Sequence, residues 1–219
     1  DPFQLGIASG DPSPEGFVLW TRLAMDPIAA NGGMDDRDYE VTWELSDDES
    51  FAKVLRSGKA KATAKLGHSV HVEVDGLAPD RWYWYRFQCG DAITKVGRAR
   101  TTPSTDAMPD SLRFAFASCQ HFETGYYTAY EHMCQEPLDL ILHLGDYIYE
   151  GAGKEDRLRV HAGPEIMSLA DYRTRHAQYK SDPHLQAAHA LAPWLVVWDD
   201  HEFDNNYANL ISEEKGIDP

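Results

Sequence analysis

The sequence contains few cysteines, few basic residues and no long apolar run. Its three cysteines, Cys89, Cys119 and Cys134, are too few for a disulfide framework. A single Cys89–Cys134 bridge remains an open alternative. No segment approaches the roughly 18 consecutive apolar residues of a membrane-spanning helix, so we expect no membrane span. Lys and Arg number 20 against 36 Asp and Glu, a formal net charge of −16, which argues against nucleic acid as a partner.

The composition is that of a folded chain. A length of 219 residues, with 42% hydrophobic and 26% charged residues, predicts one large domain or two modest ones around a sizeable core. The chain opens at Asp1 with neither an initiator Met nor a basic and apolar leader. We therefore expect a processed or recombinant form from which any export signal has been removed.

Residues 1–103 consist of short apolar segments separated by turn residues. Over 39–45, apolar side chains alternate with Glu and Thr, the period of a half-buried strand, and 82–87 is a run rich in aromatic residues. This pattern predicts an all-β domain with a sandwich fold. The segment 77–83 resembles the tyrosine corner of fibronectin type III and immunoglobulin-like sandwiches, with Tyr83 as the corner residue.

The pattern changes after a segment at 104–110 that is rich in Pro, Ser, Thr and Asp and is predicted to be a linker. Residues 111–219 alternate apolar runs with helical patterns, at about 126–135 and 168–180, and Pro183 marks the start of a further helix. This alternation predicts part of an α/β domain whose parallel sheet is covered on both faces. The apolar runs are 112–117, 138–144 and 194–198.

Polar residues follow each of these apolar runs. The first is followed by Ser118–His121, the second by Gly145–Glu150 and the third by Asp199–Glu202. Because ligands bind at the carboxyl ends of the strands in open α/β sheets, we expect the three motifs to meet at one edge. The side chains expected there are Cys119, Asp146, Tyr149, Asp200 and His201.

Each motif alone also has an ordinary structural interpretation. A Gly-Asp pair after a strand is often a turn, a buried Cys is usually a small hydrophobic residue, and an acidic run can begin a helix. Three such coincidences at the same end of three successive parallel strands are a much weaker explanation than a functional site.

The chemistry of these side chains indicates a metal site. A thiolate, a phenolate and carboxylates are costly to hold together without cations. Phenolate and carboxylate donors suit Fe³⁺, whereas Asp199 and Asn205 or Asn206 offer oxygens that suit Ca²⁺, Mg²⁺ or Mn²⁺. A metal pair bridged by Asp146 can polarise a phosphoryl oxygen and deprotonate water. His201 can bind the phosphate or protonate the leaving alkoxide.

The three motifs together resemble the PhoD-type alkaline phosphatase/phosphodiesterase family, a branch of the calcineurin-like metallophosphoesterases. Residues 3–22 also resemble the N-terminal β domain of that family, so the resemblance covers essentially the whole chain. Superfamily members usually carry Asp-x-His, Gly-Asp-x-x-Asp and Gly-Asn-His motifs. Here Cys119, Tyr149 and Asp200 replace an Asp, an Asp and an Asn, and these replacements are typical of the PhoD branch.

The resemblance implies Fe³⁺ and Ca²⁺ as cofactors, with Mg²⁺, Mn²⁺ or Zn²⁺ as alternatives at the second metal site. Asp146 is implied to bridge the metals, and Asp200 to bind the second one. The implied metal ligands are Cys119, Asp146, Tyr149 and Asp200.

The resemblance further implies hydrolysis of phosphate mono- and diesters by a metal-activated hydroxide. His201 is then the residue that faces the phosphate, and a periplasmic or secreted location is expected. Weaker candidates for metal or phosphate binding are Asp199, Asn205 and Asn206.

The family's catalytic domain continues beyond residue 219, so we expect a C-terminal segment or a second polypeptide to complete the site. Three alternatives remain open: a phospholipase D of the same family, a non-catalytic module that docks to a surface, and an iron protein for storage or electron transfer. The last leaves His201, Asn205 and Asn206 without a role.

Overall fold

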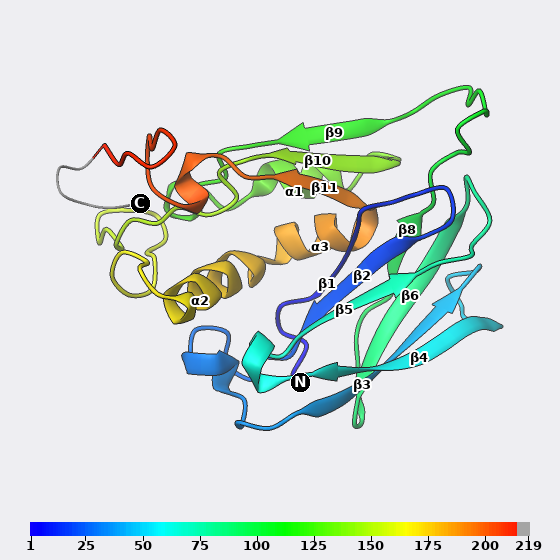
Figure 1. Cartoon of the computed structure of the whole chain (residues 1–219), viewed down its shortest axis with the longest axis horizontal. Coiled ribbons are helices and arrows are strands. Elements are labelled where there is room, and N and C mark those ends of the chain that lie inside the picture. The colour runs from blue at the N-terminus through cyan, green and yellow to red at the C-terminus, as the bar shows by residue number, and fades with distance from the viewer. Residues whose placement is uncertain (214–219) are drawn as a thin grey trace.

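The computed structural model describes residues 1–213 and contains two β-sheets and three α-helices (Figure 1). The predicted α/β part extends to residue 219, so its last six positions, 214–219, lie outside the described residues. The helices are α1 (Thr128–Met133), α2 (Leu169–Lys180) and α3 (Pro183–Leu191), and the 3₁₀ turns are η1 (Ala30–Gly33), η2 (Ala64–Leu66), η3 (Phe122–Thr124) and η4 (Asp200–Glu202).

The strands form one six-stranded sheet and one five-stranded sheet. The six-stranded sheet has the order β5 (Ser69–Val74), β2 (Phe17–Arg22), β1 (Ile7–Gly10), β11 (Trp194–Val197), β10 (Leu140–Leu144) and β9 (Phe114–Ala117). The five-stranded sheet has the order β4 (Val54–Ala62), β3 (Tyr39–Ser46), β6 (Trp82–Cys89) and β7 (Ala92–Ile93), with β8 (Gly97–Arg100) also paired to β6.

The predicted sandwich in the first part of the chain is present. Alternating residues of β2 and β5 face those of β3 and β6, and their apolar side chains form one buried cluster that includes Leu19, Val41 and Phe87. The Tyr83 hydroxyl accepts the N–H of Ala78 at 3.0 Å and donates to its carbonyl at 3.4 Å. This is the hydrogen bonding expected of a tyrosine corner.

The parallel sheet in the second part of the chain is also present, because β9, β10 and β11 pair in parallel. The six-stranded sheet continues past the predicted linker, since β1 pairs in parallel with β11 through Gly10 and Trp194. The two predicted parts therefore share one sheet. Residues 104–110 contain neither helix nor strand, and the division of the chain into domains at this segment stays a prediction.

Helices α2 and α3 begin where the sequence predicts, whereas α1 is shorter than the predicted 126–135. Ser168 caps α2 and forms a capping box with Asp171, and the Asp182 carboxylate accepts the N–H groups of His184 and Leu185 at the start of α3. Pro183 occupies the first turn of α3, where its missing N–H costs nothing. Figure 1 shows α1 and α3 alongside the parallel strands.

The prediction that helices cover both faces of the parallel sheet is wrong for the described residues. Helices α1 and α3 bury one face, with Ile141 and Trp194 in the core. On the other face the side chains are apolar but exposed, with exposed fractions of 66% for Phe116 and 57% for Val197. The physical reason is that residues 1–213 supply no helix to that side.

All three cysteines are free thiols, so the Cys89–Cys134 bridge does not form in this structure. Within residues 1–213, no helix has both the length and the apolar character that crossing a membrane requires.

We predict that Tyr83→Phe lowers the free energy of unfolding of the complete protein by about 1 kcal/mol, because the part-buried hydrogen bonds between the Tyr83 hydroxyl and the Ala78 backbone are lost. Urea denaturation measures this change. Tyr39→Phe is the matched control, since the Tyr39 hydroxyl donates to Asp35 at 3.4 Å on the exposed surface, and its effect should stay within about 0.5 kcal/mol. If the two substitutions lowered the free energy of unfolding equally, the stabilising role of the Tyr83 hydroxyl would be contradicted.

Candidate metal centre

The loops that follow β9 and β10 are joined by backbone hydrogen bonds. The Cys119 N–H donates to the Gly145 carbonyl at 3.1 Å, and the Gln120 N–H donates to the Asp146 carbonyl at 3.1 Å. Cys119 and Asp146 both adopt left-handed backbone conformations, with φ of 55° and 53°. Non-glycine residues are uncommon there and concentrate at functional sites. The first two sequence motifs are thus held side by side.

The third motif approaches the second at Gly145. A Cβ atom at this position would lie 2.5 Å from the Cβ of Asp199, and the φ of Gly145 is 105°. Both the contact and the backbone angle require glycine.

The Glu202 carboxylate fixes the second and third motifs to each other. It collects backbone N–H donors from both loops, at 3.0 Å from Asp146, 3.3 Å from Ile148 and 2.7 Å from Asp199. The Tyr147 N–H donates to it as well. Sequence reasoning missed this residue, although its spacing of three from Asp199 is that of a capping box.

Asp146, Asp200 and His201 come together as predicted from the strand ends. One ligand atom of each lies within 4.8 Å of the others. The Asp146 Oδ2 atom accepts the Tyr149 hydroxyl at 3.1 Å, whereas its Oδ1 atom is buried and has no hydrogen-bond partner among residues 1–213. A buried carboxylate oxygen without a partner is costly, and a bound cation would remove that cost.

Tyr149 lies between two imidazole rings, with ring centroids 4.2 Å from that of His121 and 4.1 Å from that of His201. Burial, followed by the charges of Asp146 and Cys119, raises the pKa of Tyr149 well above its usual value. The phenol therefore stays protonated unless a cation takes the place of its proton. Cys119 affects Tyr149 in this way but does not belong to the group formed by Asp146, Asp200 and His201.

His201 is oriented by a carboxylate that sequence reasoning did not single out. Its Nδ1 lies 2.8 Å from Oε2 of Glu150. Burial alone would lower the pKa of His201, but the hydrogen bond and charge of Glu150, with the charges of Asp146 and Asp200, raise it. The ring is thus held with Nδ1–H toward Glu150, which leaves Nε2 for another partner.

The Asp200 carboxylate is prepared for a cation by its surroundings. Burial alone would raise its pKa, but the Asn206 N–H, at 2.6 Å from Oδ2, and the charge of His201 lower it. Asp200 is therefore ionised, as a metal ligand must be.

The weaker candidates have other partners in the structure. The Asn206 side-chain amide donates to Glu213 Oε2 at 2.8 Å, and the Asn205 amide also donates to Glu213. The backbone N–H of Asn205 binds Glu150 at 3.2 Å, and Asp199 is exposed. A direct role of these three residues in metal or phosphate binding stays a prediction.

The residues present fit a metal centre. Carboxylates from Asp146 and Asp200, the imidazole of His201 and the phenol of Tyr149 share one small region, and Asp146 holds a buried oxygen that lacks a partner. Oxygen and nitrogen donors of this kind bind Fe³⁺ and divalent cations.

We predict that Gly145→Ala lowers the free energy of unfolding by about 1–3 kcal/mol, because the added Cβ meets Asp199 and the backbone angle is unfavourable. Thermal denaturation of the complete protein measures the change. Gly125→Ala is the control, because its added Cβ meets no atom within 4 Å and its φ of −168° suits any residue. Unchanged stability of the Gly145 variant would show that the two loops need not approach so closely.

Comparisons with known proteins agree with the geometry. The family model of the PhoD-like phosphatase N-terminal domain matches residues 1–103, and that of the PhoD-like phosphatase matches residues 114–218. Alkaline phosphatase D of Bacillus subtilis (strain 168) is 53% identical over an alignment of 218 residues, and the alignment covers 97% of this chain and 37% of that protein. A solved structure titled "Structure of PhoD" has a TM-score of 0.93 at 53% identity and covers 98% of this chain and 42% of that chain.

The chain therefore spans 37% of the length of the curated relative and 42% of that of the solved one. Together the two family models account for residues 1–103 and 114–218, and the similarity to the relatives extends over nearly all of this chain. The chain belongs to the PhoD-like phosphatase family.

Proposed function

We propose that this chain carries part of the catalytic centre of a metal-dependent phosphoester hydrolase of the alkaline phosphatase D type. The observation that carries the proposal is the buried Oδ1 atom of Asp146, which lacks a partner inside a group that also contains Asp200 and His201. The 53% identity to an alkaline phosphatase D supports the same activity. Phosphate mono- and diesters are the proposed substrates.

Fe³⁺ and Ca²⁺ are the proposed cofactors, with Mg²⁺, Mn²⁺ or Zn²⁺ as alternatives at the second site. Asp146, Tyr149 and Cys119 would hold the iron, and Asp200 would hold the second ion. When bound, such metals polarise the phosphoryl oxygen and lower the pKa of a water molecule. The acidic chain thereby obtains the local positive charge that a phosphate substrate requires.

His201 is the proposed proton donor to the leaving oxygen. Glu150 holds its Nδ1–H, which directs Nε2 away from that carboxylate. The raised pKa of His201 keeps a proton available on the imidazole. Glu150 thus positions His201 without touching the substrate.

The exposed apolar face of β9, β10 and β11 supports a proposal about the rest of the protein. Its exposed side chains Phe116 and Val197 lie on the side that α1 and α3 leave uncovered. Contiguous exposed apolar surface of this kind marks a contact site. Both relatives are more than twice as long as this chain. We expect polypeptide that corresponds to their additional residues to cover this face and to contribute further metal ligands.

The proposed activity is tested by Asp146→Asn in the complete protein, purified with its metals. Loss of the Asp146 carboxylate should remove bound metal and lower kcat/KM for p-nitrophenyl phosphate by about 10³-fold, because metal polarisation would supply several kcal/mol. Elemental analysis and steady-state kinetics measure both. Asp106→Asn, in the exposed linker, is the matched control and should change neither. Full metal content and activity in the Asp146 variant would contradict the proposal.

The role of Glu150 is tested by a pair of substitutions. Glu150→Ala should lower kcat by roughly 100-fold at little change in KM, because His201 loses the partner that orients it. Glu150→Gln, which can still accept the Nδ1–H bond, should recover part of this loss. Hydrolysis of p-nitrophenyl phosphate, bis-p-nitrophenyl phosphate and phosphatidylcholine by the same variants also separates a phosphatase from a phospholipase D. Equal kinetics of the Ala and Gln variants would mean that the hydrogen bond is irrelevant.

A further inference from the structure

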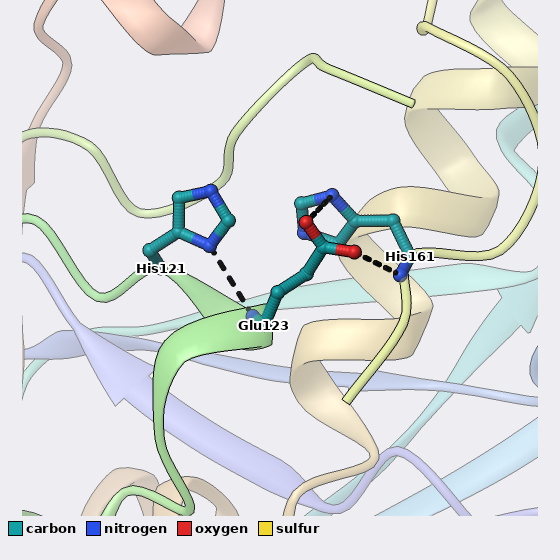
Figure 2. A group of neighbouring side chains, drawn as sticks. All are labelled: His121, Glu123 and His161. Carbon is teal, nitrogen blue, oxygen red and sulfur yellow. Dashed lines mark hydrogen bonds and ion pairs between the residues drawn. The ribbon is translucent and has the colours of Figure 1, made fainter. Parts of the chain in front are cut away.

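A second group of metal-ligand side chains lies beside the proposed centre. His121, Glu123 and His161 each place a ligand atom within 4.8 Å of the others. Figure 2 shows the Glu123 carboxylate next to the His161 ring, with the His121 ring beside the pair. Glu123 and His161 are buried, with exposed fractions of 1% and 4%, whereas His121 is half-buried. No motif of the sequence analysis includes Glu123 or His161.

The two oxygens of the Glu123 carboxylate have different surroundings. Oε1 accepts the backbone N–H groups of Lys154, at 2.8 Å, and of His161, at 3.0 Å. Oε2 lies 3.8 Å from Nδ1 of His161, which is too long for a hydrogen bond. One oxygen is therefore anchored, and the other is directed toward the imidazole rings and available to a cation.

The hydrogen bonds of His161 allow it to present an unprotonated Nδ1. Its Nε2 lies 3.0 Å from the Tyr179 hydroxyl and can donate to it. Its Nδ1 lies 3.1 Å from the Gly151 carbonyl, which can accept from it in the metal-free protein as well as from Arg175 at 3.0 Å. A cation bound at Nδ1 would displace that proton and leave Arg175 as the partner of the Gly151 carbonyl. The bond from Nε2 to the Tyr179 hydroxyl would remain, and metal-binding histidines usually make such a bond with their other ring nitrogen.

His121 completes the arrangement from the loop after β9. Its Nδ1 is unprotonated, because it accepts the Glu123 N–H at 3.2 Å, and a cation bound at Nδ1 would take the place of this hydrogen bond. The centroids of the His121 and His161 rings are 5.3 Å apart, with an interplanar angle of 20°. Two imidazoles that share a tetrahedral ion at about 2.0–2.1 Å place their centroids about 5 Å apart.

We propose that His121, Glu123 and His161 bind a divalent transition-metal ion, with Zn²⁺ as the favoured ion, in addition to the proposed catalytic metals. Two imidazoles and one carboxylate suit Zn²⁺ and leave a fourth position for water, which the half-buried His121 side makes accessible. Ca²⁺ and Mg²⁺ prefer oxygen ligands and do not match this set. The site goes beyond the proposed hydrolase centre.

An ion at this site would tie three segments together: the loop after β9, the turn η3 and the loop that precedes α2. His121 also contacts the Tyr149 ring, whose centroid lies 4.2 Å away. An ion bound by His121 would therefore restrict the movement of the Tyr149 ring at the neighbouring metal centre.

The test is titration of the metal-stripped complete protein with Co²⁺, whose visible absorption reports ligand number, followed by competition with Zn²⁺. The background is Asp146→Asn, which disables the proposed catalytic centre, so the readout does not depend on hydrolysis. We expect one Co²⁺ to bind, and His121→Ala to weaken binding by more than about 100-fold, because even outer-shell partners are worth 10–100-fold. His71→Ala, an exposed histidine on β5, is the control and should change nothing.

Circular dichroism confirms that each variant is folded, and Glu123→Gln provides a second ligand deletion with the same expected loss. If the Asp146→Asn protein binds no Co²⁺, or if His121→Ala and Glu123→Gln leave binding unchanged, the proposal is wrong. The group would then act as a hydrogen-bonded clamp on the loop before α2. That result would leave the proposed hydrolase activity untouched, since the kinetics of the Asp146 variant test it separately.

Discussion

The hydrogen bonds to the Glu202 carboxylate are the interaction on which the candidate centre depends. Backbone donors from the loop after β10 and from the turn after β11 converge on its two oxygens. Hydrogen bonds to an ionised acceptor are about twice as strong as neutral ones. They hold Asp146 and Asp200 at a fixed separation although no side-chain bond joins the two residues directly. A small metal site needs such fixed spacing, because ligands that are free to move apart lose both affinity and geometry.

The parallel strands β9, β10 and β11 supply the second condition for the centre. Because all three run the same way, the loops at their carboxyl ends lie at one edge, and that edge is where polar side chains can meet. The remainder of the described chain supports this arrangement from one side. The sandwich continues the sheet through β1, and α3 fills the core beneath it.

Much of this arrangement could be predicted from the sequence. Near-continuous apolar runs specified the parallel strands, and the polar motifs after them located Asp146, Asp200 and His201. What could not be predicted depends on contacts distant in sequence. Glu202 and Glu150 act through backbone and imidazole partners that only the fold brings near, and the side chains of Asn205 and Asn206 bind Glu213. The prediction of a sheet covered on both faces failed because an apolar strand indicates burial, not which polypeptide provides it.

The pairing of β1 with β11 bears on how the protein is made. Gly10 and Trp194 belong to opposite ends of the described chain, so the strand next to the centre finds its neighbour only after nearly the whole segment has left the ribosome. Contacts of such long sequence separation form slowly, because chain entropy is lost before they stabilise anything. The early strands must therefore wait with an open edge during synthesis, and a nascent chain in that state depends on protection from association with its neighbours.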